Sequence, residues 1–390
     1  MQFIENKNSQ FKHDLDTVKE EDRLELHSFH RYYGKLIPAI PRTAIRNFTK
    51  KGDVVFDPFS GSGTTALEAR YANRNFLGLE INPLSINMCK VKTFNYDVKI
   101  LNQINIKLME NYDNDNDDVL DDEIPFCVNR DHWFRDFVQK DLVKIRRNIE
   151  KSASEYVRKN NEMYVMFFEM VLSAIVKQVS NADTAHVFPG ISKRIRRLEA
   201  EGKIHKDVKK TFFTATKKRI KAIEECGIHD VESNFILCDS AKVDLKKYQN
   251  SVDLIVTNPP YISSVRYAET LKLELYWMKT VKNTKEYLDL QESMIGNDKI
   301  AKRDYLRAYH TKYDFINEEI DRMYKIDPKN AKVIYDFFTM MEKVIQNCAL
   351  VLKSGKKLVM KISDSKIRKT AIHTGKYLSM IAEQNGFKFV

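Results

Sequence analysis

The stretch that most constrains the fold of this chain is residues 53–83, DVVFDPFSGSGTTALEARYANRNFLGLEINP. It opens with a short apolar run at 54–56, which is followed by a turn rich in glycine and serine. Residues 64–71 then have helical propensity, and a second apolar run at 76–79 closes the unit. Strand, turn, helix and strand in a unit of roughly thirty residues predict a βαβ fold of the α/β class.

Two glycines and one acid give this unit a chemical character. Gly61 and Gly63 permit a tight turn in which the backbone can press against a bound molecule. The second apolar run ends in Glu80, where an acid of a nucleotide-binding unit contacts ribose hydroxyls. A glycine turn alone is a weak signal, so a second motif is needed to interpret it.

That second motif follows another apolar run, at residues 252–257, and reads Asn-Pro-Pro-Tyr at 258–261. The two prolines stiffen the turn, so that the side-chain oxygen of Asn258 and the carbonyl of Pro259 are prepositioned acceptors. Tyr261 offers an aromatic ring for stacking.

Four segments together resemble the amino-methyltransferases of DNA. They are HRYYGKLIP at 30–38, DPFSGSGTT at 57–65, GLEINP at 78–83 and NPPY at 258–261, in the non-permuted motif order. The resemblance implies transfer of a methyl group from S-adenosyl-L-methionine (SAM) to an exocyclic amine of adenine or cytosine. It also implies a Rossmann-like methyltransferase fold, a mostly parallel sheet with helices on both faces and the ligands at the carboxyl ends of its strands.

The resemblance assigns residues to the cofactor. Asp57 would face the methionine amino group, Glu80 the ribose hydroxyls, and Asp239, at the end of an expected strand at 235–239, the adenine amine. Glu80 could instead be an ordinary strand-end charge, and Thr64 and Thr65 mere helix caps. Asp239 could cap the next element, and 30–38 could be an aromatic loop packing on the domain. The full set is Tyr33, Lys35, Pro38, Asp57, Pro58, Phe59, Gly61, Gly63, Thr64, Thr65, Glu80, Ile81, Asn82, Asp239 and Ser240.

The catalytic residues implied are Asn258, Pro259, Pro260 and Tyr261. Two acceptors would pin the amine and aim its lone pair at the methyl group, while Tyr261 stacks on a base swung out of the duplex. Asn in the first position favours adenine N6, in restriction–modification or phage defence. Cytosine N4, guanine N2 of RNA, and a recognition subunit that is inactive or needs a partner are the alternatives.

Charge suggests a polyanionic partner. The chain has 65 Lys and Arg against 54 Asp and Glu, a net charge of +11, which also fits a merely lysine-rich protein. Twelve of the cations lie between residues 193 and 221 and predict either a phosphate-contacting surface or a solvated basic helix. The expected contacts with double-stranded DNA are Lys193, Arg194, Arg196, Arg197, Lys209, Lys210, Lys217, Lys218, Arg266 and Tyr267.

The chain divides into four expected regions. Residues 1–26 form a charged arm, and 27–94 hold the cofactor-closing segment and the SAM-binding half. Residues 95–231 are a mostly helical insertion and the candidate target-recognition region, and 232–390 are the catalytic half with an insertion at 262–329. Helices are expected at about 41–50, 138–179, 331–350 and 372–384, with a further strand at 356–362.

Other sites are not expected. The acidic run at 113–123 lacks the glycine and spacing of a calcium loop and predicts a solvated loop. The five cysteines form no close pair, which predicts neither zinc nor disulfides and fits a reducing cytoplasm. No apolar segment is long enough to span a bilayer.

The sheet edge after residue 362 looks unfinished, because residues 387–390 are barely the first strand of the antiparallel pair usual in this family. An open strand edge is a liability unless it is covered. We therefore expect either a second polypeptide that completes the sheet or a truncated chain, and a companion restriction endonuclease is a further candidate partner.

Overall fold

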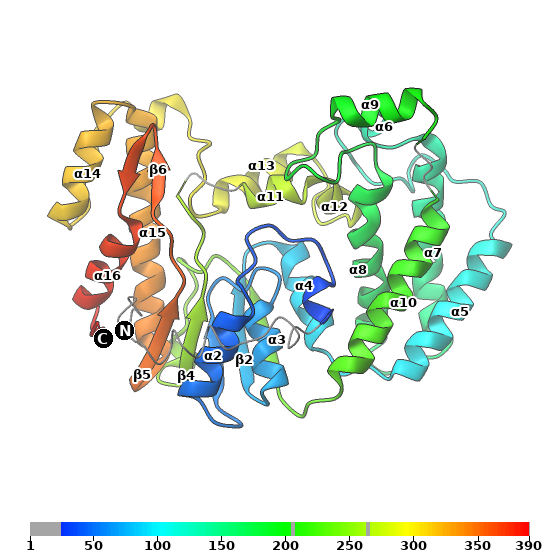
Figure 1. Cartoon of the computed structure of the whole chain (residues 1–390), viewed down its shortest axis with the longest axis horizontal. Helices are drawn as coiled ribbons and strands as arrows, with labels where there is room; N and C mark the ends of the chain where they lie inside the picture. The colour runs from blue at the N-terminus through cyan, green and yellow to red at the C-terminus, as the bar shows by residue number, and fades with distance from the viewer. Residues whose placement is uncertain (1–24, 204–206, 263–265, 390) are drawn as a thin grey trace.

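The computed structural model describes residues 25–203, 207–262 and 266–389. Within these ranges a parallel sheet of five strands, in the order β3-β2-β1-β4-β5, forms the centre (Figure 1). This confirms the expected mostly parallel α/β sheet. The strands are β1 (Val54–Asp57), β2 (Asn75–Glu80), β3 (Ser233–Leu237), β4 (Val252–Thr257) and β5 (Leu352–Met360).

Helices cover both faces of this sheet, because successive strand residues point to opposite sides. Val55 and Leu254 pack with the helices before and after β1, whereas Phe56 and Ile255 pack with the long helix that precedes β5. The first layer comprises α2 (Ala39–Phe48), α3 (Thr64–Tyr71) and α4 (Pro83–Thr93), and the second comprises α14 (Asp314–Tyr324), α15 (Pro328–Val351) and α16 (Thr374–Gln384).

A bundle of helices stands beside the sheet, on the right of Figure 1, and joins it where α4 packs on α8. Its apolar core includes Leu142, Phe167 and Phe212, all of them fully buried. The bundle contains α5 (Val98–Asn114), α6 (Arg130–Trp133), α7 (Asp136–Ser154), α8 (Asn161–Val179), α9 (Lys193–Ala200) and α10 (Val208–Cys226).

Short helices cross above the carboxyl edge of the sheet, between the bundle and the second helical layer (Figure 1). Trp277 anchors this bridge in the bundle, where its ring meets Phe134 edge-on at 5.2 Å between centroids. The bridge consists of α11 (Tyr267–Thr270), α12 (Lys272–Trp277) and α13 (Thr284–Ser293). Elsewhere lie η2 (Glu25–Ser28), η3 (Lys246–Tyr248), η4 (Lys302–Tyr305) and the antiparallel hairpin of β6 (Ser365–Ile367) and β7 (Thr370–Ile372).

Several expected boundaries are corrected by the structure. The helical stretch predicted at 138–179 is two helices separated by 155–160, where Asn160 adopts a left-handed φ of 60°. The strand expected at 235–239 ends at Leu237, so Asp239 lies beyond it.

At the carboxyl side, β5 starts at Leu352, four residues before the predicted strand, and β7 occupies Thr370–Ile372, so the last helix starts later than predicted. The strand expected at 387–390 is absent over 387–389, and Val390 lies outside the described residues. Among the described strands, β5 pairs with β4 alone.

The amino-terminal arm falls on residues that are not described, apart from Glu25 and Leu26. Leu26 is buried and Glu25 pairs with Lys218, so these two residues pack on the fold. In the described part of the chain, no helix combines the length and apolar character needed to cross a membrane.

Candidate active site

A pocket opens at the carboxyl ends of β1, β2 and β4, where the strand order changes direction. Segments far apart in the sequence meet there: the segment around 32–36, the glycine turn, the end of β2, the turn after β3, and the Asn258 turn. The lining includes these residues of the expected cofactor set: Lys35, Asp57, Pro58, Phe59, Gly61, Thr64, Thr65, Glu80, Ile81, Asn82, Asp239 and Ser240.

Asp57 is buried at the end of β1 and joins three elements. Its carboxylate accepts hydrogen bonds from the hydroxyls of Thr65 (2.8 Å) and Thr257 (2.6 Å) and from the Phe59 N–H (2.9 Å). Burial raises the pKa of Asp57 to about 6, and these hydrogen bonds oppose the rise. Thr65 thus holds Asp57, and α3 has Gly63 at its amino-terminal cap position with no side-chain capping bond.

Glu80 also lines the pocket, at the end of the neighbouring strand β2. Its two carboxylate oxygens accept from the backbone N–H of Gly61 (2.7 Å) and of Asn82 (2.8 Å). Each oxygen keeps a lone pair, which suits bidentate contact with a diol. Burial raises the pKa of Glu80 to about 7, with the backbone hydrogen bonds opposing it.

The two glycines have different reasons to be glycine. Both have positive φ, 51° at Gly61 and 75° at Gly63, which L side chains rarely adopt. A Cβ on Gly61 would meet the Tyr32 ring at 3.3 Å, inside the pocket lining. A Cβ on Gly63 would meet Cys89 of α4 at 3.0 Å, so this glycine permits close helix packing and does not line the pocket.

The segment before α2 closes one side of the pocket, but with a different tyrosine from the one expected. Tyr32 lines the pocket and stacks on Tyr267 with 6.3 Å between ring centroids, whereas Tyr33 is 45% exposed and is not part of the lining. Lys35 directs its ammonium group to the carbonyls of His27 (2.8 Å) and His30 (2.7 Å). Pro38 does not line the pocket.

Beyond β3, two polar residues line the pocket. Asp239 accepts from the Ala241 N–H at 2.9 Å and lies beside Lys242, with 2.9 Å between Oδ2 and Nζ. The Ser240 hydroxyl donates to the Pro58 carbonyl at 2.5 Å and so fixes the glycine turn.

The Asn-Pro-Pro-Tyr turn forms the opposite wall. Asn258 and Pro260 line the pocket, Pro259 is buried, and Tyr261 is not part of the lining. The Asn258 Nδ2 donates to the Gly34 carbonyl at 3.1 Å, which joins the Asn-Pro-Pro-Tyr turn to the segment before α2.

Several lining residues were not predicted from the sequence: Tyr32, Gly34, Leu36, Ser60, Ser62, Ser293, Met294 and Ile295. Tyr32 and Gly34 stand in the quoted 30–38 motif, and Ser60 and Ser62 in the glycine turn, so motif position could have found them. Nothing in the sequence marks Met294 or Ile295, which follow directly after α13.

Comparison with known proteins agrees with this geometry. Residues 7–91 match the family model described as DNA methylase. Over this part of the chain the protein is similar to the DNA amino-methyltransferases. The match covers the closing segment, the glycine turn and the end of β2.

Individual relatives are distant. The type II methyltransferase M.MjaII of Methanocaldococcus jannaschii is 25% identical over 43% of this chain and 32% of its own length. M.BsoBI of Geobacillus stearothermophilus is 23% identical over 77% of this chain and 62% of its own length. M.MvaI of Kocuria varians is 22% identical over 89% of this chain and 78% of its own length. The chain thus spans less than two thirds of the first two relatives.

Among solved structures, the rRNA methyltransferase aviRa from Streptomyces viridochromogenes covers 63% of this chain and 69% of its own at 10% identity. Its TM-score is 0.26, which is too low to bear on substrate or mechanism.

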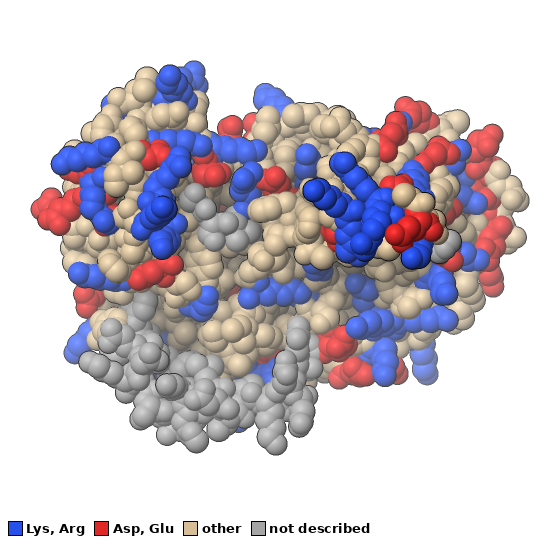
Figure 2. Space-filling model, turned by 45° about the horizontal axis from the view of Figure 1, so that its top comes forward, with Lys and Arg blue, Asp and Glu red and all other residues tan. Residues whose placement is uncertain are grey.

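Most of the basic residues expected to contact DNA divide between two helices of the bundle. On α9, Lys193 and Arg196 are exposed without an ion pair to any described residue, while Arg194 pairs with Asp183 at 2.5 Å. Arg197 is 3.8 Å from Glu201. Figure 2 shows Lys and Arg gathered in the area of α9, on the face that carries the carboxyl edge of the sheet.

On α10 half of the expected cations are already paired. Lys209 pairs with Asp113, and Lys218 with Glu25 at 2.8 Å. Lys210 and Lys217 are exposed, without an ion pair in the described chain.

Two further residues were expected to contact nucleic acid. Arg266 pairs with Glu269 at 2.7 Å, and Tyr267 lines the pocket beside Tyr32.

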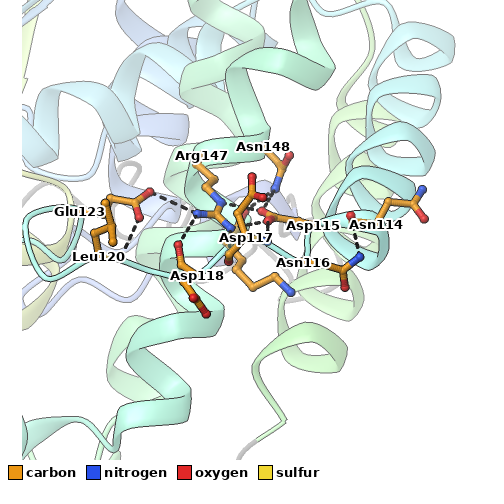
Figure 3. Close-up of polar contacts among 10 residues, drawn as sticks. Asn114, Asp115, Asn116, Asp117, Asp118, Leu120, Glu123, Arg147 and Asn148 are labelled. Atoms are coloured by element: carbon orange, nitrogen blue, oxygen red, sulfur yellow. Dashed lines mark hydrogen bonds and ion pairs between the residues drawn. The ribbon is translucent and has the colours of Figure 1, made fainter.

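The acidic run at 113–123 is exposed over most of its length, as predicted, but Asp115 is held against α7 (Figure 3). The Asp115 side chain is only 7% exposed, pairs with Arg147 and accepts from Asn148 at 2.8 Å, and its pKa is lowered chiefly by the bond from Arg147. The Arg147 guanidinium also donates to the Asp117 carbonyl at 2.8 Å. The run therefore clamps α5 to α7, and the described residues contain no cluster of three potential metal ligands.

Proposed function

We propose that this protein transfers a methyl group from SAM to an exocyclic amine of double-stranded DNA. The observation that carries the proposal is the shared pocket. Asp57 and Glu80, suited to the polar groups of SAM, line the same cavity as Asn258, which is suited to an amine. The match of residues 7–91 to the DNA methylase model, and the similarity to type II methyltransferases, support DNA as the substrate.

The residues present fit the cofactor. Glu80 offers two held oxygens for the ribose diol, and Asp57 retains lone-pair capacity on its buried carboxylate for an ammonium group. Asp239, which also lines the pocket, would accept from the adenine amine. SAM supplies the methyl group as an electrophile bound to a sulfonium centre.

The protein's contribution to the reaction is positioning. An exocyclic amine is a poor nucleophile, because its lone pair is delocalised into the ring. Asn258 Oδ1 and the Pro259 carbonyl would each accept one N–H and so favour a pyramidal nitrogen with its lone pair directed at the methyl group. The nitrogen sheds its extra proton after transfer, so the step needs no strong base.

We also propose which exocyclic amine is methylated. Asn258 in the first position of the motif favours adenine N6 over cytosine N4, and methylation of guanine N2 in RNA is a weaker alternative. We further propose a role in restriction–modification or phage defence beside a companion endonuclease. A partner polypeptide required for activity remains an alternative to an enzyme active by itself.

Labelled SAM offered in parallel to unmethylated genomic DNA and to unmodified tRNA tests the function. We expect label in DNA alone, and nucleoside digestion followed by mass measurement identifies N6-methyladenine or N4-methylcytosine. Label found only in tRNA contradicts the proposal. SAM binding without transfer to either nucleic acid favours the subunit that needs a partner.

A further inference from the structure

Lys361 is the first residue after β5 and lies beside the catalytic turn. Its backbone N–H donates to the Thr257 carbonyl at 2.9 Å, which brings it next to the end of β4. Its ammonium group donates to the Tyr261 hydroxyl and to the Ser363 hydroxyl (3.1 Å), and lies 4.9 Å from the centre of the Tyr261 ring.

The Tyr261 hydroxyl in turn reaches Asn258. The two side chains meet at 3.1 Å between the hydroxyl and Oδ1. The direction of this bond follows from the other side of the amide: the Gly34 carbonyl, 3.1 Å from Nδ2, can only accept. Nδ2 must therefore face Gly34 and Oδ1 must face Tyr261, so the tyrosine hydroxyl donates.

Lysine has donors and no acceptor, so Lys361 can only donate to that hydroxyl. The three groups thus form a chain of donors from Lys361 through Tyr261 to Asn258. A charged donor at its start strengthens the following hydrogen bond, because neighbouring hydrogen bonds polarise one another. Asn258 Oδ1 keeps its second lone pair for an incoming N–H.

We propose that Lys361 is a positioning residue, which fixes Tyr261 and through it the orientation of the Asn258 amide. This inference rests on the proposed methyl transfer to an amine. A direct contact between Lys361 and a DNA phosphate is the competing explanation, and it makes a different prediction for variants that lack the tyrosine hydroxyl.

A double-mutant cycle separates the two explanations. The proteins are wild type, Lys361→Met, Tyr261→Phe and the double variant, with Lys366→Met as matched control. Lys366 is exposed on the neighbouring β6 and has no ion pair in the described chain. Initial rates are measured with labelled SAM at saturating concentration and unmethylated genomic DNA, together with SAM affinity and thermal stability.

We expect Lys361→Met to lower kcat by about tenfold or more, the effect of losing a charge-assisted hydrogen bond. SAM affinity stays unchanged, and Lys366→Met retains the wild-type rate. In the Tyr261→Phe background the lysine substitution adds less than about twofold, because the hydroxyl through which it acts is gone. An equal loss of rate in both backgrounds overturns the proposal, as does a fully active Lys361→Met.

Fluorine NMR of protein labelled with fluorotyrosine tests the contact without activity. The Tyr261 resonance, identified by its loss in Tyr261→Phe, should shift in Lys361→Met and stay in place in Lys366→Met. An unmoved resonance overturns the inference. A wild type that transfers no methyl group to DNA overturns the proposed function instead, so the two failures are distinguishable.

Discussion

The two walls of the pocket are built differently. One wall contains Asp57 and Glu80, and we call it the cofactor wall after its proposed ligand. Both residues are buried, and together they accept five hydrogen bonds, three of them from backbone N–H groups. The other wall is the Asn-Pro-Pro-Tyr turn, which we call the catalytic wall after its proposed role. There Asn258 is partly exposed and is fixed by one hydrogen bond at each end of its amide. The first wall is held in one arrangement before a ligand binds, and the second leaves acceptor capacity for a substrate amine.

The largest effect expected from this contrast is at the catalytic wall. Asn258→Ala should lower turnover by about 10²- to 10³-fold, the usual loss when one preorganised polar group is removed from a reacting centre. SAM affinity should stay within about twofold, because the cofactor wall is untouched. Rates with labelled SAM and calorimetric titration measure the two quantities, and Asn102→Ala, on the exposed face of α5, is the matched control. Normal turnover in Asn258→Ala contradicts the assignment.

The next effect is at the cofactor wall. Asp57→Asn should weaken SAM binding by about tenfold or more, because an amide replaces an anion that faces the cofactor's ammonium group. The control is Asp253→Asn, a buried acid of β4 that accepts from the Val54 N–H and pairs with Lys353. We expect the control to lower the melting temperature and leave SAM affinity unchanged. Equal affinity in both variants shows that Asp57 only supports the sheet.

SAM affinity should depend on pH, because burial raises the pKa of Glu80 to about 7. The pKa of Asp57, raised to about 6, should extend this dependence to lower pH. As pH falls from 8 to 6, the Glu80 carboxylate takes up a proton and loses acceptor capacity. SAM affinity should therefore fall by up to about tenfold for each unit of pH. Stability of the unliganded fold changes in the opposite sense. The folded state holds this proton more tightly than the unfolded state, so stability declines as pH rises between about 4.5 and 7.

Glu80→Gln should flatten both curves near pH 7. Calorimetric titration and thermal unfolding across pH 5.5–8.5, in the wild type and in this variant, measure the two trends. A wild-type affinity that is constant over this range contradicts the role of Glu80 as an ionised acceptor.

The smallest effect concerns the bundle. Replacing Lys193 and Arg196 of α9 by Glu should weaken binding to sheared duplex DNA several-fold at low salt. It should also reduce the salt slope by about 0.9 for each phosphate that these side chains no longer neutralise. The matched pair is Lys210 and Lys217 of α10, where the same charge change should have less effect because that helix runs away from the carboxyl edge (Figure 1). An equal loss of affinity from both pairs would mean that the basic stretch attracts DNA only through its overall positive charge, and that α9 forms no specific contact surface.

Much of the cofactor wall could be predicted, because its signals are local. The helix at 64–71 and both strands around the glycine turn follow from short apolar runs and glycine positions. Glu80 and Asn258 follow from motif position.

The rest depends on contacts between distant residues. The choice between Tyr32 and Tyr33 is decided by which ring packs on Gly61. Lys361 lies 100 positions from the tyrosine that it contacts, and periodicity carries no information about such a pair.

The basic stretch shows a second limit of the sequence. Composition counts cations but not their partners, and Lys209 and Arg194 are paired with acids from other segments. The acidic run has the same limit, because its sequence does not show which acids are paired. The Asp115 side chain packs against Arg147 and is largely shielded from solvent.

The bond from Thr257 to Asp57 joins residues 200 positions apart. A contact of such separation requires the closure of a long loop, whose entropy cost must be met before the contact can contribute. The cofactor wall is therefore complete only after β4 has docked beside β1, and a chain without β4 would have the glycine turn but not this support. SAM would then stabilise only chains that have finished folding, and its binding would report on the maturity of each newly made molecule.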